Sequence, residues 1–188
     1  MAEQVNRGPI AAGAEEMPVS GAFGPVVSSA HLASGASPAL SEFEFGLILV
    51  SHAFHRWMVR GMAAAGFADL SPLDVLVLHT VNHRHKTKTL ADICLVLNVE
   101  DTHNVNYALK KLTRLGLVKG EKTGKVKAVS ISAKGEAACR KYREIREELL
   151  VKPVKSVGVN EAGLSELAAT MRALSGNYDQ AARSATTL

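Results

Sequence analysis

The feature that most constrains the fold is a close succession of short amphipathic segments over residues 70–131. Ser71 followed by Pro72 predicts a helix start, because the hydroxyl can cap the first turn and proline lacks an N–H that this turn leaves unbonded. Thr89 predicts the cap of a short helix whose apolar residues recur at helical spacing. Asp101 or the next residue caps a longer helix. Three helices therefore follow one another with tight connections.

A predicted β-hairpin comes directly after these helices. Leu117–Lys122 and Lys125–Ile131 have the composition of strands, and Thr123-Gly124 between them indicates a tight turn. Helices joined by tight turns and followed by a hairpin are the layout of a winged helix-turn-helix. We therefore predict a mainly α fold with a small β-hairpin wing, in the α+β class.

Long helices are predicted on both sides of this unit. Ser41 with Glu44 fits a capping box at the start of the first. Ser132 begins a charged helix that Pro153 should break near residue 150. Asn160 caps a last amphipathic helix. The first and last helices carry apolar stripes that one winged domain does not cover, so we expect them to form a homodimer.

These patterns divide the chain of 188 residues into three parts. Residues 1–39 are rich in Ala, Gly, Ser and Pro and are expected to be a flexible tail. Residues 40–150 form the predicted winged domain with its flanking helices. Residues 151–188 form a linker and the C-terminal dimerisation helix. No apolar run reaches the roughly 20 residues of a membrane span, and no signal-peptide pattern begins the chain, so we expect a cytoplasmic protein without a membrane partner.

The charge distribution indicates a polyanionic partner. The formal net charge is +4. Between Arg84 and Lys155 lie 17 of the 22 basic residues but only 8 of the 18 acidic residues. The basic surface therefore coincides with the predicted winged domain, as expected of a protein that binds double-stranded DNA.

The helix after Asp101 has the character of a recognition helix. If Val105, Leu109 and Leu112 are buried, its opposite face is polar and basic. Asn104 and Asn106 can each pair with adenine through two hydrogen bonds, whereas lysines further along suit backbone phosphate. Together with the wing lysines, the predicted DNA-binding residues are Thr102, His103, Asn104, Asn106, Tyr107, Lys110, Lys111, Arg114, Lys119, Lys122, Lys125 and Lys127. We expect the four wing lysines to share one face of the hairpin.

Five segments in this order resemble the MarR family of bacterial transcriptional regulators. They are Leu70–Leu76, Thr89–Ile93, Asn104–Leu112, Leu115–Val118 and Val129–Gly135. The resemblance implies an obligate dimer that binds pseudo-palindromic operators, often under the control of a small-molecule effector. One departure concerns the wing tip, where lysines at positions 122 and 125 replace the family's Asp-x-Arg element.

The function expected from these observations is sequence-specific transcriptional regulation, as a repressor. The alternative is a winged-helix adaptor that binds protein rather than a specific DNA sequence, which the altered wing tip favours. No phosphate-binding loop, dinucleotide fingerprint or nucleophile elbow occurs, so we expect no enzyme activity and no cofactor.

Histidines and cysteines offer further alternatives. His79 and His83 have the spacing of paired metal ligands, but without further ligands at a clear spacing we expect no metal site. Cys94 and Cys139 cannot form a disulfide framework and are expected to be packed thiols rather than redox sensors. Trp57 is expected in the core, although with His52 and His55 it could line an effector pocket.

Overall fold

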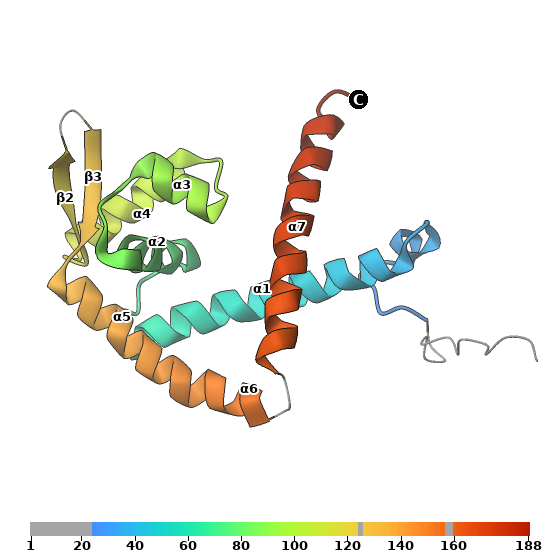
Figure 1. Ribbon diagram of the computed structural model, residues 1–188, viewed down its shortest axis with the longest axis horizontal. Coiled ribbons are helices and arrows are strands. Elements are labelled where there is room, and N and C mark those ends of the chain that lie inside the picture. The colour runs from blue at the N-terminus through green and yellow to red at the C-terminus, as the bar shows by residue number, and fades with distance from the viewer. Residues whose placement is uncertain (1–23, 124–125, 157–159) are drawn as a thin grey trace, which may run out of the picture. The chain divides into compact units, whose positions relative to one another are not determined.

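The computed structural model describes residues 24–123, 126–156 and 160–188, without the side chains of residues 122, 123, 126 and 127. The chain divides into two compact units, residues 1–52 and 53–188. Figure 1 shows mostly helices with one small sheet, whose strand order is β1–β3–β2. The mainly α prediction is therefore confirmed. The elements are η1 (Ala30–Ser34), α1 (Pro38–Ala64), α2 (Pro72–Asn82), η2 (His83–His85), β1 (Lys88–Thr89), α3 (Leu90–Leu97), α4 (Thr102–Arg114), β2 (Val118–Thr123), β3 (Val126–Ile131), α5 (Ala133–Arg146), the π-helical turn η3 (Glu147–Val151), α6 (Lys152–Ser156) and α7 (Glu161–Ala185).

The first long helix begins earlier in the sequence than predicted. Helix α1 starts at Pro38, so the predicted capping box at Ser41 is wrong. Ser41 lies inside the helix and is buried, and its hydroxyl donates a hydrogen bond of 2.7 Å to the Leu32 carbonyl in η1. The part of the predicted tail at residues 24–39 thus contains η1 and the start of α1, and the rest lies outside the described residues.

The predicted caps of α2 and α3 are confirmed as reciprocal capping boxes. The Ser71 hydroxyl accepts from the Asp74 backbone N–H at 3.2 Å, and the Asp74 carboxylate accepts from the Ser71 N–H at 2.8 Å. Thr89 and Asp92 repeat the pattern at 3.1 and 2.8 Å. Asn98 ends α3 in the left-handed conformation, with φ 51°.

Helix α2 lies at the centre of the second unit and packs against α3, α4, α5 and β3. It therefore buries more than the single stripe that its sequence predicts. Val75, Leu78 and Val81 are fully buried, whereas Leu73 and Leu76 are only partly buried. An amphipathic period identifies one covered face, whereas α2 is covered on several sides.

The two strands of the hairpin pair as predicted, and an additional strand joins them. Val118 lies opposite Ile131, and Thr123 belongs to β2, where it pairs with Val126. The prediction that Thr123 lies in the turn is therefore wrong, and residues 124–125 lie outside the described residues. The short strand β1, which sequence analysis did not predict, pairs with β3 at residues 128 and 129.

The helix that follows the wing does not break at Pro153, contrary to the prediction. Helix α5 continues through η3 into α6, and Pro153 is the second residue of α6. Proline removes one backbone donor and crowds the carbonyl four residues earlier, and the wider π-helical turn gives room at that point. Asn160 caps α7 as predicted, accepting from the Gly163 N–H at 2.7 Å. Within the described residues, no helix is long and apolar enough to cross a membrane.

Candidate nucleic-acid interface

Helix α4 is held firmly on one side. The Asp101 carboxylate caps it by accepting from the His103 backbone N–H at 2.9 Å. Val105, Leu109 and Leu112 are buried, as predicted, against a core to which α2, α3 and β2 contribute. A helix fixed in this way presents its opposite face rigidly to a partner.

The opposite face of α4 is polar and open. The exposed predicted residues on it are Thr102, His103, Asn104, Asn106, Tyr107, Lys110 and Arg114. Tyr107 is 70% exposed, unusually high for an aromatic side chain without a binding partner. The Asn104 amide donates one N–H to Asp101 at 2.9 Å. Its carbonyl oxygen and second N–H have no partner in the described part of the chain, and an adenine edge requires this pair of groups.

The C-terminal half of this face has a shallow basic hollow. Tyr107, Lys110, Lys111 and Arg114 line a hollow of about 190 Å³. Lys110 and Arg114 are exposed and have no ion-pair partner within the described residues. Cations without acidic partners on one helix suit backbone phosphate.

Lys111 differs from the other predicted residues because its ammonium group is paired within the protein, although its side chain also lines the hollow. Its ammonium group lies 2.8 Å from the Asp74 carboxylate and also donates to the Asp69 carbonyl. The Lys111 side chain is 18% exposed and that of Asp74 is 4% exposed. This lysine ties α4 to the N-terminus of α2, so its assignment as a phosphate contact is corrected.

The wing lysines are only partly described. Lys119 is exposed and lies 3.4 Å from Glu121. The Ser130 hydroxyl also donates to Glu121 at 2.8 Å, and both contacts lower the pKa of the Glu121 carboxyl. Strand pairing places Lys119 opposite Ser130 but Lys122 opposite Lys127. Positions three apart on a strand fall on alternate faces, so the prediction that the wing lysines share one face is wrong. Lys125 and the side chains of residues 122 and 127 lie outside the described residues.

Comparison with known families covers this region. Residues 70–135 match the model of the winged helix DNA-binding domain. The chain carries a winged helix DNA-binding domain. The matched segment runs from the residue before the α2 cap to the first turn of α5, and so contains α4 and both wing strands. No curated protein sequence matches the chain.

Solved structures show the same fold over about 70% or more of the chain. A MarR family regulator from Neisseria meningitidis is 18% identical with a TM-score of 0.60, and the match covers 76% of this chain and 94% of that one. The M. tuberculosis transcriptional regulator MosR is 18% identical with a TM-score of 0.56, over 70% and 94% of the two chains. MarR from E. coli, in its oxidized form, is 15% identical with a TM-score of 0.53, over 68% and 90%. The chain has the fold of the MarR-family regulators.

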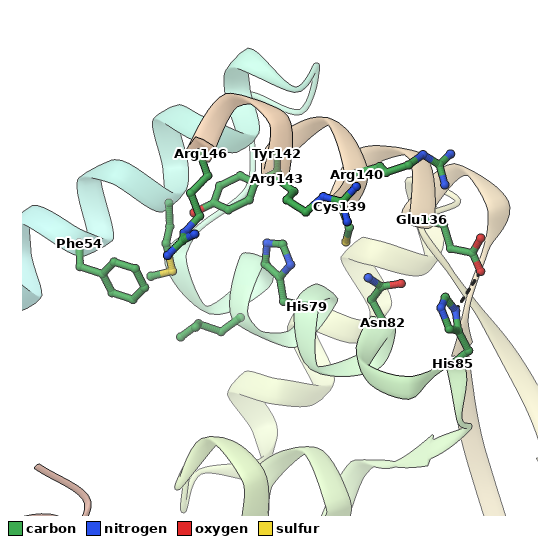
Figure 2. Close-up of a pocket in the computed structure, with 12 residues that line it drawn as sticks. Phe54, His79, Asn82, His85, Glu136, Cys139, Arg140, Tyr142, Arg143 and Arg146 are labelled. Atoms are coloured by element: carbon green, nitrogen blue, oxygen red, sulfur yellow. Dashed lines mark ion pairs between the residues drawn. The ribbon is translucent and has the colours of Figure 1, made fainter. Parts of the chain in front are cut away.

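A second feature of this winged helix protein is a cavity of about 710 Å³ between α2 and α5 (Figure 2). His79 and Asn82 point from α2 toward α5. Arginines and Tyr142 lie on α5 along the opposite side. The lining residues are Phe54, Met58, Leu76, His79, Asn82, His85, Glu136, Cys139, Arg140, Tyr142, Arg143 and Arg146. The volume is in the range of small-molecule pockets.

The middle of the cavity contains polar groups without protein partners. His79 Nε2 and Asn82 Oδ1 are buried atoms that form no hydrogen bond with any described residue. Burial lowers the pKa of His79, so its imidazole is neutral near pH 7. The His79 ring also lies 4.9 Å from the Tyr142 ring, between centroids, which holds the imidazole in place. At one end of the cavity His85 and Glu136 are 3.3 Å apart. Among the described residues, no cluster of His, Cys, Asp and Glu could hold a metal ion.

The Cys139 thiol in this cavity is expected to react slowly. Burial, with a contribution from Glu136, raises its pKa to about 11. A thiol two units above an ordinary cysteine has roughly a hundredfold less thiolate at pH 7.5. In a Cys94→Ala background, alkylation of the native protein by iodoacetamide should therefore be at least about a hundredfold slower than alkylation in urea. Comparable rates in the two conditions would show that Cys139 is an accessible thiolate.

Two sets of functional residues were missed by sequence analysis. Asp74 looks like a helix cap, and nothing near it in the sequence reveals its second role as the partner of Lys111. Arg140, Arg143 and Arg146 alternate with glutamates along the sequence, a pattern that is typical of a solvated helix face. Their spacing of three residues was the available signal, because it places them on one side of α5.

Proposed function

We propose that this protein is a bacterial transcriptional regulator that binds a pseudo-palindromic DNA operator as a homodimer. The observation that carries the proposal is the open face of α4, where Asn106, Tyr107 and Lys110 are exposed on a helix whose other side is fixed in the core. Such a helix fits the major groove, with amide side chains at the base edges and cations at the phosphates. A dimer on an operator works as a repressor when it blocks access to a promoter, and its place of action is the cytoplasm.

Exposed apolar surface supports the homodimer. Ile48, Leu49 and Val50 are exposed on α1, and Leu164 and Leu167 are exposed on α7. Soluble proteins rarely expose long apolar stripes to water. A second copy of the same chain would cover both stripes in a symmetric dimer. Sedimentation at micromolar concentration tests this part. A monomer under those conditions would contradict it.

The operator is tested by selection of bound genomic fragments with the purified full chain at physiological salt. A recovered pseudo-palindrome with half-sites about one helical turn apart supports the proposal. Weak binding that does not depend on sequence would contradict it and would favour the adaptor function.

Residue roles are tested on the recovered operator. Asn106→Ala is expected to cost about 1–3 kcal/mol of binding free energy and to relax specificity at one base pair. Lys110→Ala should weaken binding to every sequence. It should also reduce by about one the slope of the logarithm of the binding constant against the logarithm of the salt concentration. Lys141→Ala is the matched control, because this exposed lysine on α5 pairs with Glu144 and lies outside the open face. Equal losses in all three variants would contradict the assigned roles.

A small-molecule effector in the α2–α5 cavity is the last part of the proposal. Helix α2 forms one wall of the cavity and packs directly on α4. A ligand that favours one position of α2 would therefore shift the recognition helix through the direct contact between the two helices.

A further inference from the structure

The Asp101 carboxylate divides its two oxygens between two neighbours at the start of α4. One oxygen, Oδ1, accepts from the His103 backbone N–H at 2.9 Å and so caps the helix. The other oxygen, Oδ2, accepts from the side-chain Nδ2 of Asn104, also at 2.9 Å. A helix cap needs only the first of these bonds. The second bond therefore acts on the side chain of Asn104, which belongs to the open face of α4.

The bond to Asp101 fixes the orientation of the Asn104 amide. A carboxylate only accepts hydrogen bonds, so the amide must turn its NH2 group toward Asp101. One N–H of this group is then used within the protein. The carbonyl oxygen and the second N–H of Asn104 have no partner among the described residues, and the side chain is exposed. Asn104 thus offers a binding partner one acceptor and one donor in a fixed arrangement.

Base edges in the major groove distinguish this arrangement from the reversed amide. Adenine presents the acceptor N7 and the donor N6, which match one donor and one acceptor on Asn104. Guanine presents two acceptors, N7 and O6, and would place O6 against the Asn104 carbonyl oxygen. An amide without a fixed partner can rotate and offer both of its N–H groups to guanine. The bond to Asp101 withholds one of these two donors.

We propose that Asp101 is a positioning residue that makes Asn104 select adenine over guanine in the operator. Asp101 acts through the Asn104 amide and does not itself contact the base. Specificity of this kind comes from rejecting the wrong base as well as from binding the right one. The inference rests on the proposed function, because it concerns how the recognition helix reads one base pair.

Two substitutions of Asp101 keep the helix cap and change the Asn104 amide in different ways. In Asp101→Ser the hydroxyl can accept from the His103 N–H, but nothing fixes Asn104. In Asp101→Asn the new carbonyl oxygen can cap the helix, and the new NH2 group takes the place of Oδ2. A donor at that place favours the reversed Asn104 amide, with both N–H groups directed outward. Both variants lose the same negative charge, so any general gain in attraction to phosphate should be equal in the two.

Equilibrium binding of the full chain is measured on the operator recovered by genomic selection and on duplexes with each base pair replaced in turn. Asn104→Ala first identifies the base pair at which Asn104 acts. At this pair the parent protein should prefer adenine to guanine by about tenfold or more. Asp101→Ser should reduce the preference to within about threefold of unity, and Asp101→Asn should reverse it in favour of guanine.

Asn106 provides a comparison within the same helix. Its side chain is exposed and has no hydrogen-bond partner among the described residues, and positions two apart on a helix do not face each other. The base preference that Asn106→Ala removes should therefore be unchanged in both Asp101 variants. Urea midpoints show whether the two variants keep the stability that the cap provides.

Base preferences in the two Asp101 variants decide the inference. A parent protein that does not prefer adenine at the Asn104 base pair would overturn it. Equal preferences in Asp101→Ser and Asp101→Asn would also overturn it, because loss of a charge or a weaker cap affects both variants alike. Asp101→Ser combined with Asn104→Ala should show the same ratio of adenine to guanine binding as Asn104→Ala alone. A different ratio would mean that Asp101 acts on the base directly.

Failure of this inference is distinguishable from failure of the proposed function. If the parent protein binds an operator and the Asp101 variants retain its preference for adenine, only the role of Asp101 is wrong. If the parent protein selects no operator, the proposed function is wrong, and the role of Asp101 in base selection is wrong with it.

Discussion

Replacement of Asp74 by alanine is expected to lower the free energy of unfolding by about 3–5 kcal/mol, as in other proteins that lose one partner of a buried ion pair. The Asp74 side chain is 4% exposed, and its carboxylate accepts from the Lys111 ammonium at 2.8 Å. The same carboxylate caps α2 at the Ser71 N–H. Alanine removes both bonds and leaves the Lys111 charge beside the core. Urea denaturation at one fixed protein concentration measures the loss, since a dimer's stability depends on concentration.

Two matched variants identify the cause of that loss. Glu144→Ala breaks the pair with Lys141, in which both side chains are 58% exposed, and should change stability by no more than about 0.5 kcal/mol. Asp74→Ala combined with Lys111→Met should be more stable than Asp74→Ala alone, because the unpaired charge is gone. The remaining loss of stability of the double variant relative to the parent protein should come mainly from the missing helix cap, about 1 kcal/mol. A loss in Asp74→Ala no larger than that of Glu144→Ala would show that the pair is not buried in solution.

Local signals in the sequence were sufficient to predict the winged unit. The capping boxes at Ser71 and Thr89 and the left-handed end of α3 at Asn98 depend on residues within three or four positions, so a single sequence specifies them. The recognition helix was predicted for the same reason, since its apolar stripe has one period and one covered face. These elements also place most predicted DNA-binding residues on the open face of α4.

Predictions failed where a residue's environment depends on distant parts of the chain. Lys111 looks like any surface lysine until Asp74, 37 residues away, is brought beside it. Strand β1 has two residues and forms only because β3 lies beside it. Arg84 has a left-handed backbone conformation with φ of 59°, which arginine rarely adopts, and His85 follows it with φ of 50°. Such features are imposed by tertiary packing.

The cavity illustrates the same limit at a functional site. The alternating charges of α5 are typical of a solvated helix. This interpretation is correct for Lys141, which pairs with Glu144 on the exposed side. The sequence does not show which side of α5 faces His79 and Asn82. Only the packing of α2 against α5 converts three arginines with regular spacing into the wall of a cavity.

Gly135→Ala is the second substitution expected to have a large effect. Gly135 is buried in the first turn of α5, and its N–H donates to the Ser132 cap at 3.0 Å. A β-carbon at this position would lie 2.1 Å from the Leu117 carbonyl oxygen and 2.6 Å from the Ile131 side chain. The carbonyl belongs to the backbone just before β2 and already accepts from the Ser132 N–H at 3.1 Å, so it cannot yield as a flexible side chain would.

Because α5 and the base of the wing would have to separate, the loss of stability in Gly135→Ala should reach or exceed the upper end of the roughly 1–3 kcal/mol that overpacking costs. Gly120→Ala in β2 is the matched control, since a β-carbon there meets nothing within 4 Å. Its stability should stay within about 0.5 kcal/mol of the parent or rise slightly, because alanine reduces the freedom of the unfolded chain. Urea midpoints of the three proteins at equal concentration measure both effects. A Gly135→Ala protein as stable as the parent would mean that the first turn of α5 does not pack against the Leu117 carbonyl. The described packing of α5 against the base of the wing would then be wrong.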